Sequence, residues 1–215
     1  MKKIKLALLA MSTVFLMASC GNKPDSEKDA EVGEAETIEE TVETATSYVI
    51  DTEASSIRWE GFKSIGYSHW GTISLSEGSI AVDGDAVTGG SFTIDMNTMV
   101  NDDLEDAEKN ADLIGHLTST DFFNTAEFPT ASFEIASVDA GSVTGNLTIK
   151  GITKSITFPA EMSMADGVMT ATADFNFDRT QWDISYGSKT LFEELGDDFI
   201  LDDINMQLNL VANAQ

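Results

Sequence analysis

The sequence predicts an all-β domain in which about eight antiparallel strands close into a barrel with one inserted helix. Downstream of Tyr48, short stretches alternate apolar and polar residues, as strands with one buried face do. Turn signals such as Asp83-Gly84 and Asp166-Gly167 separate these stretches, and such tight joins require antiparallel pairing. The region contains no cysteine, so its stability has to come from an apolar core, which a chain of about 170 residues can bury.

The alternating stretches follow one another to the end of the chain, with further turn signals at Gly89-Gly90, Ala140-Gly141 and Lys150-Gly151. Such strands have to hide both their apolar face and their edges. A closed barrel does both, and a two-sheet sandwich is an alternative that the spacing does not exclude. In chain order the apolar positions are Ile57, Trp59 and Gly61; Ile73 and Leu75 before Glu77-Gly78, then Ile80 and Val82 after it; Phe92, Ile94 and Met96; Ala131, Phe133 and Ile135; Val143, Gly145, Leu147 and Ile149; Ile156, Phe158, Ala160 and Met162; Met169, Ala171, Ala173, Phe175 and Phe177; and Ile204, Met206, Leu208 and Leu210.

One stretch, residues 102–117, predicts the inserted helix. Its apolar residues Leu104, Ala107, Ala111 and Ile114 recur at roughly helical spacing. A shorter helical turn is expected over Leu191–Leu195.

Residues 1–19 resemble a bacterial lipoprotein signal peptide that ends at Cys20, the single cysteine of the chain. A basic start precedes an apolar segment at residues 6–18, and Ala18-Ser19 supplies small residues before the cysteine. About 13 apolar residues are too few to cross a bilayer, which needs roughly 20. The alternative is an ordinary secreted protein with a free thiol.

Residues 20–47 are expected to form a disordered acidic linker that begins at the lipidated Cys20. The segment is rich in Asp and Glu and has no aromatic residue, so it cannot bury enough apolar surface to order itself. A solvated spacer is the simpler interpretation, and an export address for the cell surface is the alternative. The barrel domain is expected over residues 48–215.

The formal net charge of −25 excludes whole classes of function. Such a surface repels nucleic acid and anionic lipid headgroups, both of which are bound by Lys and Arg. Membrane attachment is therefore expected through acyl chains, palmitate among them, on Cys20. The expected location is the bacterial cell envelope, at the periplasmic face or the outer surface of the outer membrane.

Three motifs resemble those of the YceI-like family of secreted, lipocalin-like barrels. They are His-Leu-Thr-Ser-Thr-Asp-Phe-Phe at 116–123 with Phe-Pro-Thr-Ala-Ser-Phe at 128–133, Thr-Gly-Asn-Leu-Thr-Ile-Lys-Gly-Ile-Thr-Lys at 144–154, and Phe-Asp-Arg-Thr-Gln-Trp at 177–182. The resemblance spans residues 48–213. It implies an eight-stranded lipocalin-like barrel whose interior holds a long isoprenoid, either a polyprenyl chain or an isoprenoid quinone.

An eight-stranded barrel has an interior that side chains can fill or that can hold one small ligand. Here large inward groups alternate with Gly61, Gly145 and several alanines, which would leave a channel. Without the resemblance, a packed core is the better interpretation of any single aromatic residue; with it, a lumen is favoured. The expected lipid-binding residues of the wall are Trp59, Phe92, Ile94, Phe133, Ile135, Leu147, Phe158, Phe175 and Phe177.

Two polar residues complete the candidate site. His116 follows the expected helix and would hydrogen-bond either a lipid head or the barrel itself. Arg179 would meet a head at the barrel mouth or pair with Asp178 or another acid. The negative charge disfavours a diphosphate head unless Arg179 or Lys189 holds it, so a neutral quinone is preferred. His69 is expected to be exposed in a loop.

No catalytic residue and no metal site are predicted. The chain has two histidines far apart in sequence, no ligating cysteine, and none of the nucleophile-elbow or phosphate-loop motifs. No cofactor is expected apart from the bound isoprenoid or quinone. The expected partners are that lipid and the membrane, with a second copy of the chain left open. The alternative function is a non-catalytic stress-response or interaction protein with a packed barrel and an acidic surface for a protein partner.

Overall fold

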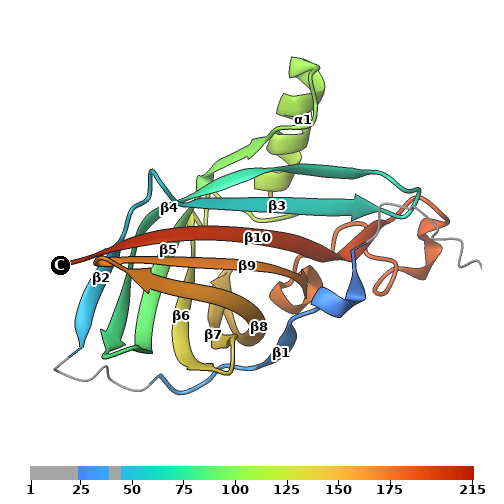
Figure 1. Cartoon of the computed structure of the whole chain (residues 1–215). Coiled ribbons are helices and arrows are strands. Elements are labelled where there is room, and N and C mark those ends of the chain that lie inside the picture. The colour runs from blue at the N-terminus through green and yellow to red at the C-terminus, as the bar shows by residue number, and fades with distance from the viewer. Residues whose placement is uncertain (1–23, 39–44) are drawn as a thin grey trace, which may run out of the picture.

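The computed structural model describes residues 24–38 and 45–215 (Figure 1). The signal-peptide prediction and the lipidation of Cys20 therefore lie outside the described residues. Within them, no helix is both long and apolar enough to span a bilayer.

The described residues form ten strands, one α-helix and three short 3₁₀ turns. The strands are β1 (Glu31–Glu34), β2 (Thr46–Ile50), β3 (Ser56–Lys63), β4 (Ser68–Asp83), β5 (Ala86–Asn101), β6 (Thr130–Asp139), β7 (Ser142–Ile149), β8 (Ile152–Ala165), β9 (Val168–Asp178) and β10 (Ile200–Ala214). The helix is α1 (Ala107–Thr118), and the 3₁₀ turns are η1 (Ser26–Lys28), η2 (Arg179–Trp182) and η3 (Glu193–Leu195).

The strands close into an antiparallel barrel with eight positions around the wall. Strands β2 and β3 share one of these positions, because both pair with β10 on one side and with β4 on the other. From there the order runs through β4 to β10 and returns, since β9 pairs with both β8 and β10. The predicted eight-stranded barrel is confirmed, and the two-sheet sandwich is wrong.

Three of the predicted hairpin turns have two consecutive residues with positive φ. These are Ala140-Gly141 (49° and 85°), Lys150-Gly151 (51° and 72°) and Asp166-Gly167 (52° and 78°). Positive φ at both central residues is the type I′ geometry, whose twist matches that of paired strands. The predicted turn at Gly89-Gly90 is wrong, because both residues lie inside β5. A Cβ on Gly90 would lie 2.8 Å from the carbonyl oxygen of Ser79, so this glycine permits close strand approach.

Strand β4 is one long strand where the sequence indicates an interruption at Glu77-Gly78. Its register against β5 shifts between Leu75 and Glu77, as at a β-bulge. The bulge moves the buried side from odd positions, such as Ile73, to even positions, such as Ile80. Both halves of the strand therefore face the same core.

Helix α1 projects outward from the barrel end beside β5 and buries none of its residues fully (Figure 1). Asp106 caps it by accepting hydrogen bonds from the backbone N–H groups of Glu108 and Lys109. The predicted start at residue 102 is too early, because Asp103 accepts a hydrogen bond from the backbone N–H of Trp70 and is held against β4. The short turn expected over Leu191–Leu195 is the 3₁₀ turn η3.

The N-terminal segment fills a gap between β8 and β9. These two strands pair only near their shared turn, with residues 160–165 opposite 168–173. Strand β1 pairs with residues 154–157 of β8, and Asp29 bridges to Asn176 of β9. Residues 24–38 therefore differ from the disordered linker expected over 20–47: their backbone groups are recruited by the open edges of two barrel strands, which composition does not reveal.

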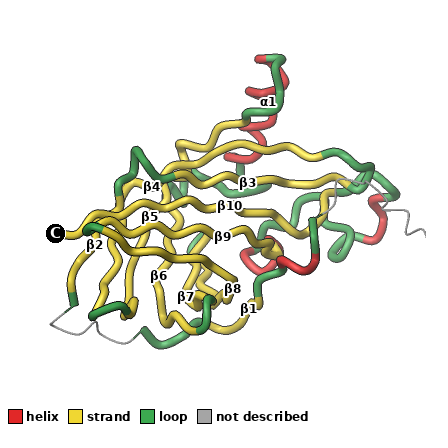
Figure 2. Tube along the Cα trace, viewed as in Figure 1, coloured by secondary structure: helices red, strands yellow, loops and turns green. Residues whose placement is uncertain are grey.

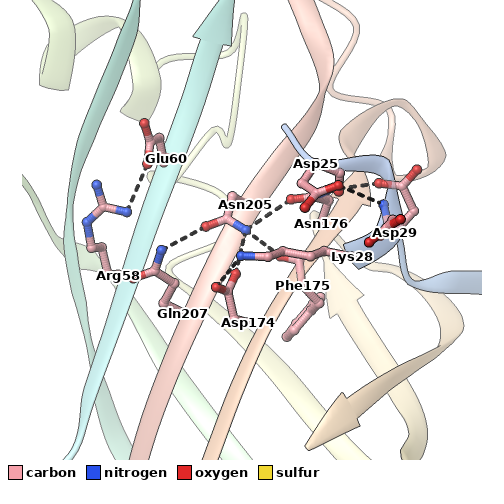
Figure 3. Close-up of polar contacts among 11 residues, drawn as sticks. Asp25, Lys28, Asp29, Arg58, Glu60, Asp174, Phe175, Asn176, Asn205 and Gln207 are labelled. Carbon is pink, nitrogen blue, oxygen red and sulfur yellow. Dashed lines mark hydrogen bonds and ion pairs between the residues drawn. The ribbon is translucent and has the colours of Figure 1, made fainter. Parts of the chain in front are cut away.

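Side-chain amides hold this segment in place (Figure 3). Asn176, fully buried, donates to the carbonyl oxygen of Asp25 (2.7 Å) and to Asp29 Oδ1 (2.9 Å). Asn205 of β10 donates in turn to Asn176 Oδ1 (3.0 Å). Farther along, Asn146 of β7 accepts from the backbone N–H of Glu36 (2.8 Å) and donates to its carbonyl oxygen (2.9 Å).

Replacing Asn146 should release the end of the N-terminal segment. Asn146→Ala removes both hydrogen bonds to Glu36, and we expect a loss of about 1–2 kcal/mol in the local opening free energy. Hydrogen–deuterium exchange should show faster exchange across residues 31–38, with the rest of the barrel unchanged. Asn97→Ala, at an exposed asparagine of β5, is the matched control. Equal protection of residues 31–38 in both variants would contradict the anchoring role of Asn146.

Candidate functional site

The barrel encloses a cavity of about 480 Å³ whose lining is almost entirely apolar. Its volume lies within the range of small-molecule sites in proteins. The eleven residues predicted as a site all line it: Trp59, Phe92, Ile94, Phe133, Ile135, Leu147, Phe158, Phe175, Phe177, His116 and Arg179. Their contact with a lipid remains a prediction.

An aromatic wall runs along one side of this cavity. The Phe158 and Phe175 rings stack with centroids 4.1 Å apart and planes 11° from parallel, and Phe133 lies 5.7 Å from Phe158. Phe92 continues the row beyond Phe133, at 6.3 Å. These contacts hold each ring against its neighbours and so keep the rings at the wall.

Small residues keep the middle of the barrel open. A Cβ on Gly145 would lie 2.4 Å from Phe133 Cζ, so this glycine gives the Phe133 ring room to lie close to β7. A Cβ on Gly61 would meet no atom within 4 Å, which shows that the lumen beside it is free. Ala160, Ala171 and Ala173 also line the cavity. The alternation of large and small residues thus leaves a channel.

The cavity lining reaches the barrel end that carries α1 and the β9–β10 connection, which we call the mouth; Figure 2 shows the backbone of these elements. The lining there includes His116 together with Leu113 and Leu117 of α1, and Tyr186, which is 46% exposed. The His116 ring makes edge contacts with Phe122 (5.0 Å between centroids) and Tyr186 (4.5 Å). His116 therefore joins the helix to the rim of the opening.

His69 is a residue of this opening that sequence reasoning missed. It lies in β4, not in an exposed loop, and it lines the cavity. Its Nδ1 is 2.8 Å from Asp103 Oδ2. Partial burial acts to raise the pKa of Asp103, but hydrogen bonds from the Trp70 backbone, His69 and Asn101 outweigh it and lower that pKa. An ionised Asp103 fixes the proton of His69 on Nδ1 and leaves Nε2 as the acceptor of the neutral ring. The sequence did contain a signal for this position: His69 shares its parity with Gly71 and Ile73, as residues on one face of a strand do.

Arg179 is committed to the protein around it. Its side chain is 1% exposed and donates to the carbonyl oxygens of Leu201 (3.2 Å), Ile184 (2.5 Å) and Ile200 (3.4 Å). The acidic residue that pairs with it is Asp202, whose Oδ1 lies 3.5 Å from Arg179 Nη2. Burial lowers the pKa of Arg179, and the negative charges of Asp202 and Asp178 act in the opposite direction. The geometry favours the pairing interpretation over a contact with a ligand head.

Trp59 carries the one buried side-chain polar atom that lacks a hydrogen-bond partner within the described residues. This atom is the indole Nε1, and the ring lines the cavity. Trp59 pairs with Gly71 in the β3–β4 ladder, and the next same-face pair toward the opening is Gly61 with His69. The Trp59 ring therefore lies at the cavity wall, one strand pair inside the mouth, and its Nε1–H is buried without a partner.

A family model for the YceI-like domain matches residues 48–212. A curated relative, a UPF0312 protein of Shewanella denitrificans, is 35% identical over 128 residues, which cover 56% of this chain and 64% of the relative. The chain thus aligns with less than two thirds of that relative's length.

Solved structures share the fold at low sequence identity. BcnA of Burkholderia cenocepacia superposes with a TM-score of 0.56 at 19% identity, covering 76% of this chain and 99% of BcnA. A polyisoprenoid binding domain of Saccharophagus degradans, implicated in plant cell wall breakdown, gives 0.56 at 15% identity, with 78% and 98% covered. A YCEI protein of Campylobacter jejuni gives 0.50 at 20% identity, with 66% and 83% covered.

Removing Arg179 should destabilise the fold. In Arg179→Met, three carbonyl oxygens and Asp202 lose a buried donor, and we expect the free energy of unfolding to fall by about 3–5 kcal/mol. Arg58→Met is the matched control, because Arg58 is partly exposed and its pair with Glu60 is worth less than about 1 kcal/mol. Urea unfolding of both variants measures the difference. If the two variants had the same free energy of unfolding, the structural role of Arg179 would be contradicted. Arg179 would then again be a candidate for binding the lipid head.

Proposed function

Because this chain belongs to the YceI-like family, we propose that its barrel is a non-catalytic binding protein for a long isoprenoid lipid. The observation that carries the proposal is the apolar cavity along the barrel axis. The polyisoprenoid-binding description of the Saccharophagus degradans domain supports the lipid class. The alternative of a barrel packed with its own side chains is not favoured, since the lumen holds a cavity of about 480 Å³.

An isoprenoid chain suits this cavity energetically. Each methylene moved from water into an apolar site contributes about 0.8 kcal/mol, so ten contribute roughly 8 kcal/mol before the cost of ordering the chain. The methionines of the lining, such as Met96 and Met162, adapt their shape to a flexible ligand. Binding then requires no polar network along the tail.

The unpaired Nε1–H of Trp59 favours a lipid whose head carries an acceptor oxygen. A pure hydrocarbon would leave this donor unpaired, whereas a quinone carbonyl or an alcohol could accept its hydrogen bond. Three cationic side chains of the described residues lie near the mouth, and each already has a protein partner. Lys63 pairs with Asp198, Lys189 donates to the carbonyl oxygen of Gly196, and Arg179 donates to Leu201 and Ile184, which disfavours a diphosphate head. The head of the proposed ligand is therefore neutral, near the mouth, with the tail toward Ala160 and Ala171.

The attachment proposed for this barrel is an acylated Cys20 in a bacterial envelope membrane. Its support is the sequence pattern of residues 1–20 together with a net charge that disfavours electrostatic adhesion to anionic lipid. Mass spectrometry of the membrane-extracted protein tests it. Diacyl-modified Cys20 at the N-terminus is expected, and an unmodified cysteine would contradict it.

Filling the lumen should weaken lipid binding without unfolding the barrel. Ala171→Phe places a ring where the tail would lie, and displacing two methylenes costs about 1.6 kcal/mol, or more than tenfold in affinity. Thr170→Phe, on the exposed face of the same strand, is the matched control. Organic extraction followed by mass spectrometry measures the lipid per protein molecule. Stoichiometric lipid in the parent and the control but not in Ala171→Phe is expected; equal lipid in all three would place the ligand elsewhere.

Removing the indole donor should discriminate between ligand heads. Trp59→Phe keeps an aromatic ring at the wall but loses the N–H, so we expect affinity for an isoprenoid quinone to fall about tenfold. Affinity for a polyprenyl hydrocarbon without oxygen should stay unchanged. Parallel titrations of both lipids with the parent and the variant give the answer. An equal loss for the two lipids would show that Trp59 acts through packing alone.

A further inference from the structure

Exposed apolar side chains gather on two loops at the mouth of the barrel. Among the described residues, nine large apolar side chains are exposed, and six of them belong to the β3–β4 turn or the β9–β10 connection. We name these six the apolar rim: Ile65, Tyr67, Tyr186, Leu191, Phe192 and Leu195. Single exposed apolar residues are ordinary, whereas a cluster of this kind marks an interaction surface.

The two loops form one continuous surface. The backbone N–H of Ser64 donates to the carbonyl oxygen of Phe199 (3.0 Å), and the N–H of Phe199 donates to Ser64 Oγ (3.1 Å). Lys63 pairs with Asp198 at 2.6 Å. Tyr186 of the rim also lines the cavity, so the rim borders the opening through which a ligand would pass.

The ordered N-terminal segment begins at the same end of the barrel. Asp25 and Asp29 are held by Asn176, near the end of β9, and Asn176 in turn accepts a hydrogen bond from Asn205 in β10 (Figure 3). These are the two strands that the β9–β10 connection joins. In Figure 1 the start of this segment lies at the barrel end that carries the loops following β9.

Sequence distance then limits how far this end can lie from an anchor at Cys20. Four residues lie between Cys20 and Asp25, so the two are five residue steps apart, and a fully extended chain of that length spans at most about 18 Å. An anchor carried by a linker of 27 residues would set no such limit. The attachment of residues 25–36 to the barrel removes most of that slack and would keep the mouth close to an anchor at Cys20.

We propose that the apolar rim docks on the surface of a lipid bilayer. The inference rests on the attachment at Cys20 proposed above, which supplies the short tether. Phe, Tyr and Leu side chains are of the kind that insert at the boundary between headgroups and acyl chains. The opening of the cavity then faces the bilayer, and a lipid tail passes between membrane and lumen without crossing water.

Charge near the rim selects the kind of membrane. Glu193 and Glu194 lie within the β9–β10 connection, and Asp197 and Asp198 follow them, whereas Lys189 is the one basic residue between Tyr186 and Phe199. Anionic headgroups are repelled by such a surface. The bilayer that fits the rim is therefore zwitterionic, and anionic lipid should weaken the docking.

An environment-sensitive fluorophore placed on the rim tests the docking directly. The processed chain (residues 20–215) with Cys20→Ser receives one new cysteine, either Phe192→Cys at the rim or Val168→Cys at the opposite end of the barrel. Both sites carry exposed apolar residues, so they are matched. With phosphatidylcholine vesicles, nitrobenzoxadiazole at position 192 should brighten severalfold and shift to the blue, while the label at 168 should not change. No response at 192, or an equal response at both sites, would overturn the proposal, as would stronger binding to vesicles enriched in phosphatidylglycerol.

A second measurement separates docking from lipid binding. The parent and a Leu191→Asn/Phe192→Asn variant are coupled through Cys20 to a maleimide lipid in phosphatidylcholine vesicles that contain an isoprenoid quinone. We expect quinone transfer into the variant to slow severalfold, while uptake from detergent solution stays equal to that of the parent. Equal transfer rates would overturn the docking proposal. Failure of both proteins to take up quinone from detergent would instead contradict the proposed function. The docking proposal would then be decided by the fluorophore measurement.

Discussion

Closure of the backbone hydrogen-bond ladder around the barrel is the constraint on which the rest of the structure depends. A closed wall removes strand edges, and it also fixes the inward side of every strand. Two positions in this wall are not filled by one continuous strand. β2 and β3 together form one position, and β1 completes the seam where β8 and β9 part. The N-terminal segment is thus a structural part of the barrel.

The alternation of residues along a strand carries most of the information that the sequence holds about this fold. Period-two patterns place side chains on a face without knowledge of the partners, so the wall residues from Trp59 to Phe177 could be assigned to the lumen. The features that were missed depend on partners. β1 is a strand because β8 offers it an edge, and its acidic composition alone indicates disorder. His69 lies in a strand because Gly61 pairs with it, and Gly90 is a site of close approach because Ser79 lies opposite.

Polar groups around the lumen fall into two kinds, and the difference determines what each can do. Arg179 donates to the carbonyl oxygens of Ile184 in the β9–β10 connection and of Ile200 and Leu201 at the start of β10, so it ties that connection to the barrel wall. Trp59 Nε1 is buried and has no partner within the described residues, which is why the proposed ligand carries an acceptor oxygen. From the sequence alone, both are large side chains that can donate hydrogen bonds and that lie in or next to an apolar strand. Their roles follow from hydrogen bonds between residues far apart in the chain.

Attachment of the N-terminal segment has to overcome charge repulsion. Burial raises the pKa of Asp203, and the carboxylates of Asp29, Asp178 and Asp202 raise it further. A raised carboxyl pKa favours the folded chain only in acid, and this contribution is lost as the pH rises through the folded-state pKa. At neutral pH the hydrogen bonds of Asn176 to Asp25 and Asp29, and the ion pair of Lys28 with Asp174, therefore act against the ionised cluster. A chain that needed only a flexible spacer would gain nothing from holding its N-terminal segment here against that repulsion. The arrangement fits the proposal of an anchor at Cys20, because it would set the distance from that anchor to the barrel mouth.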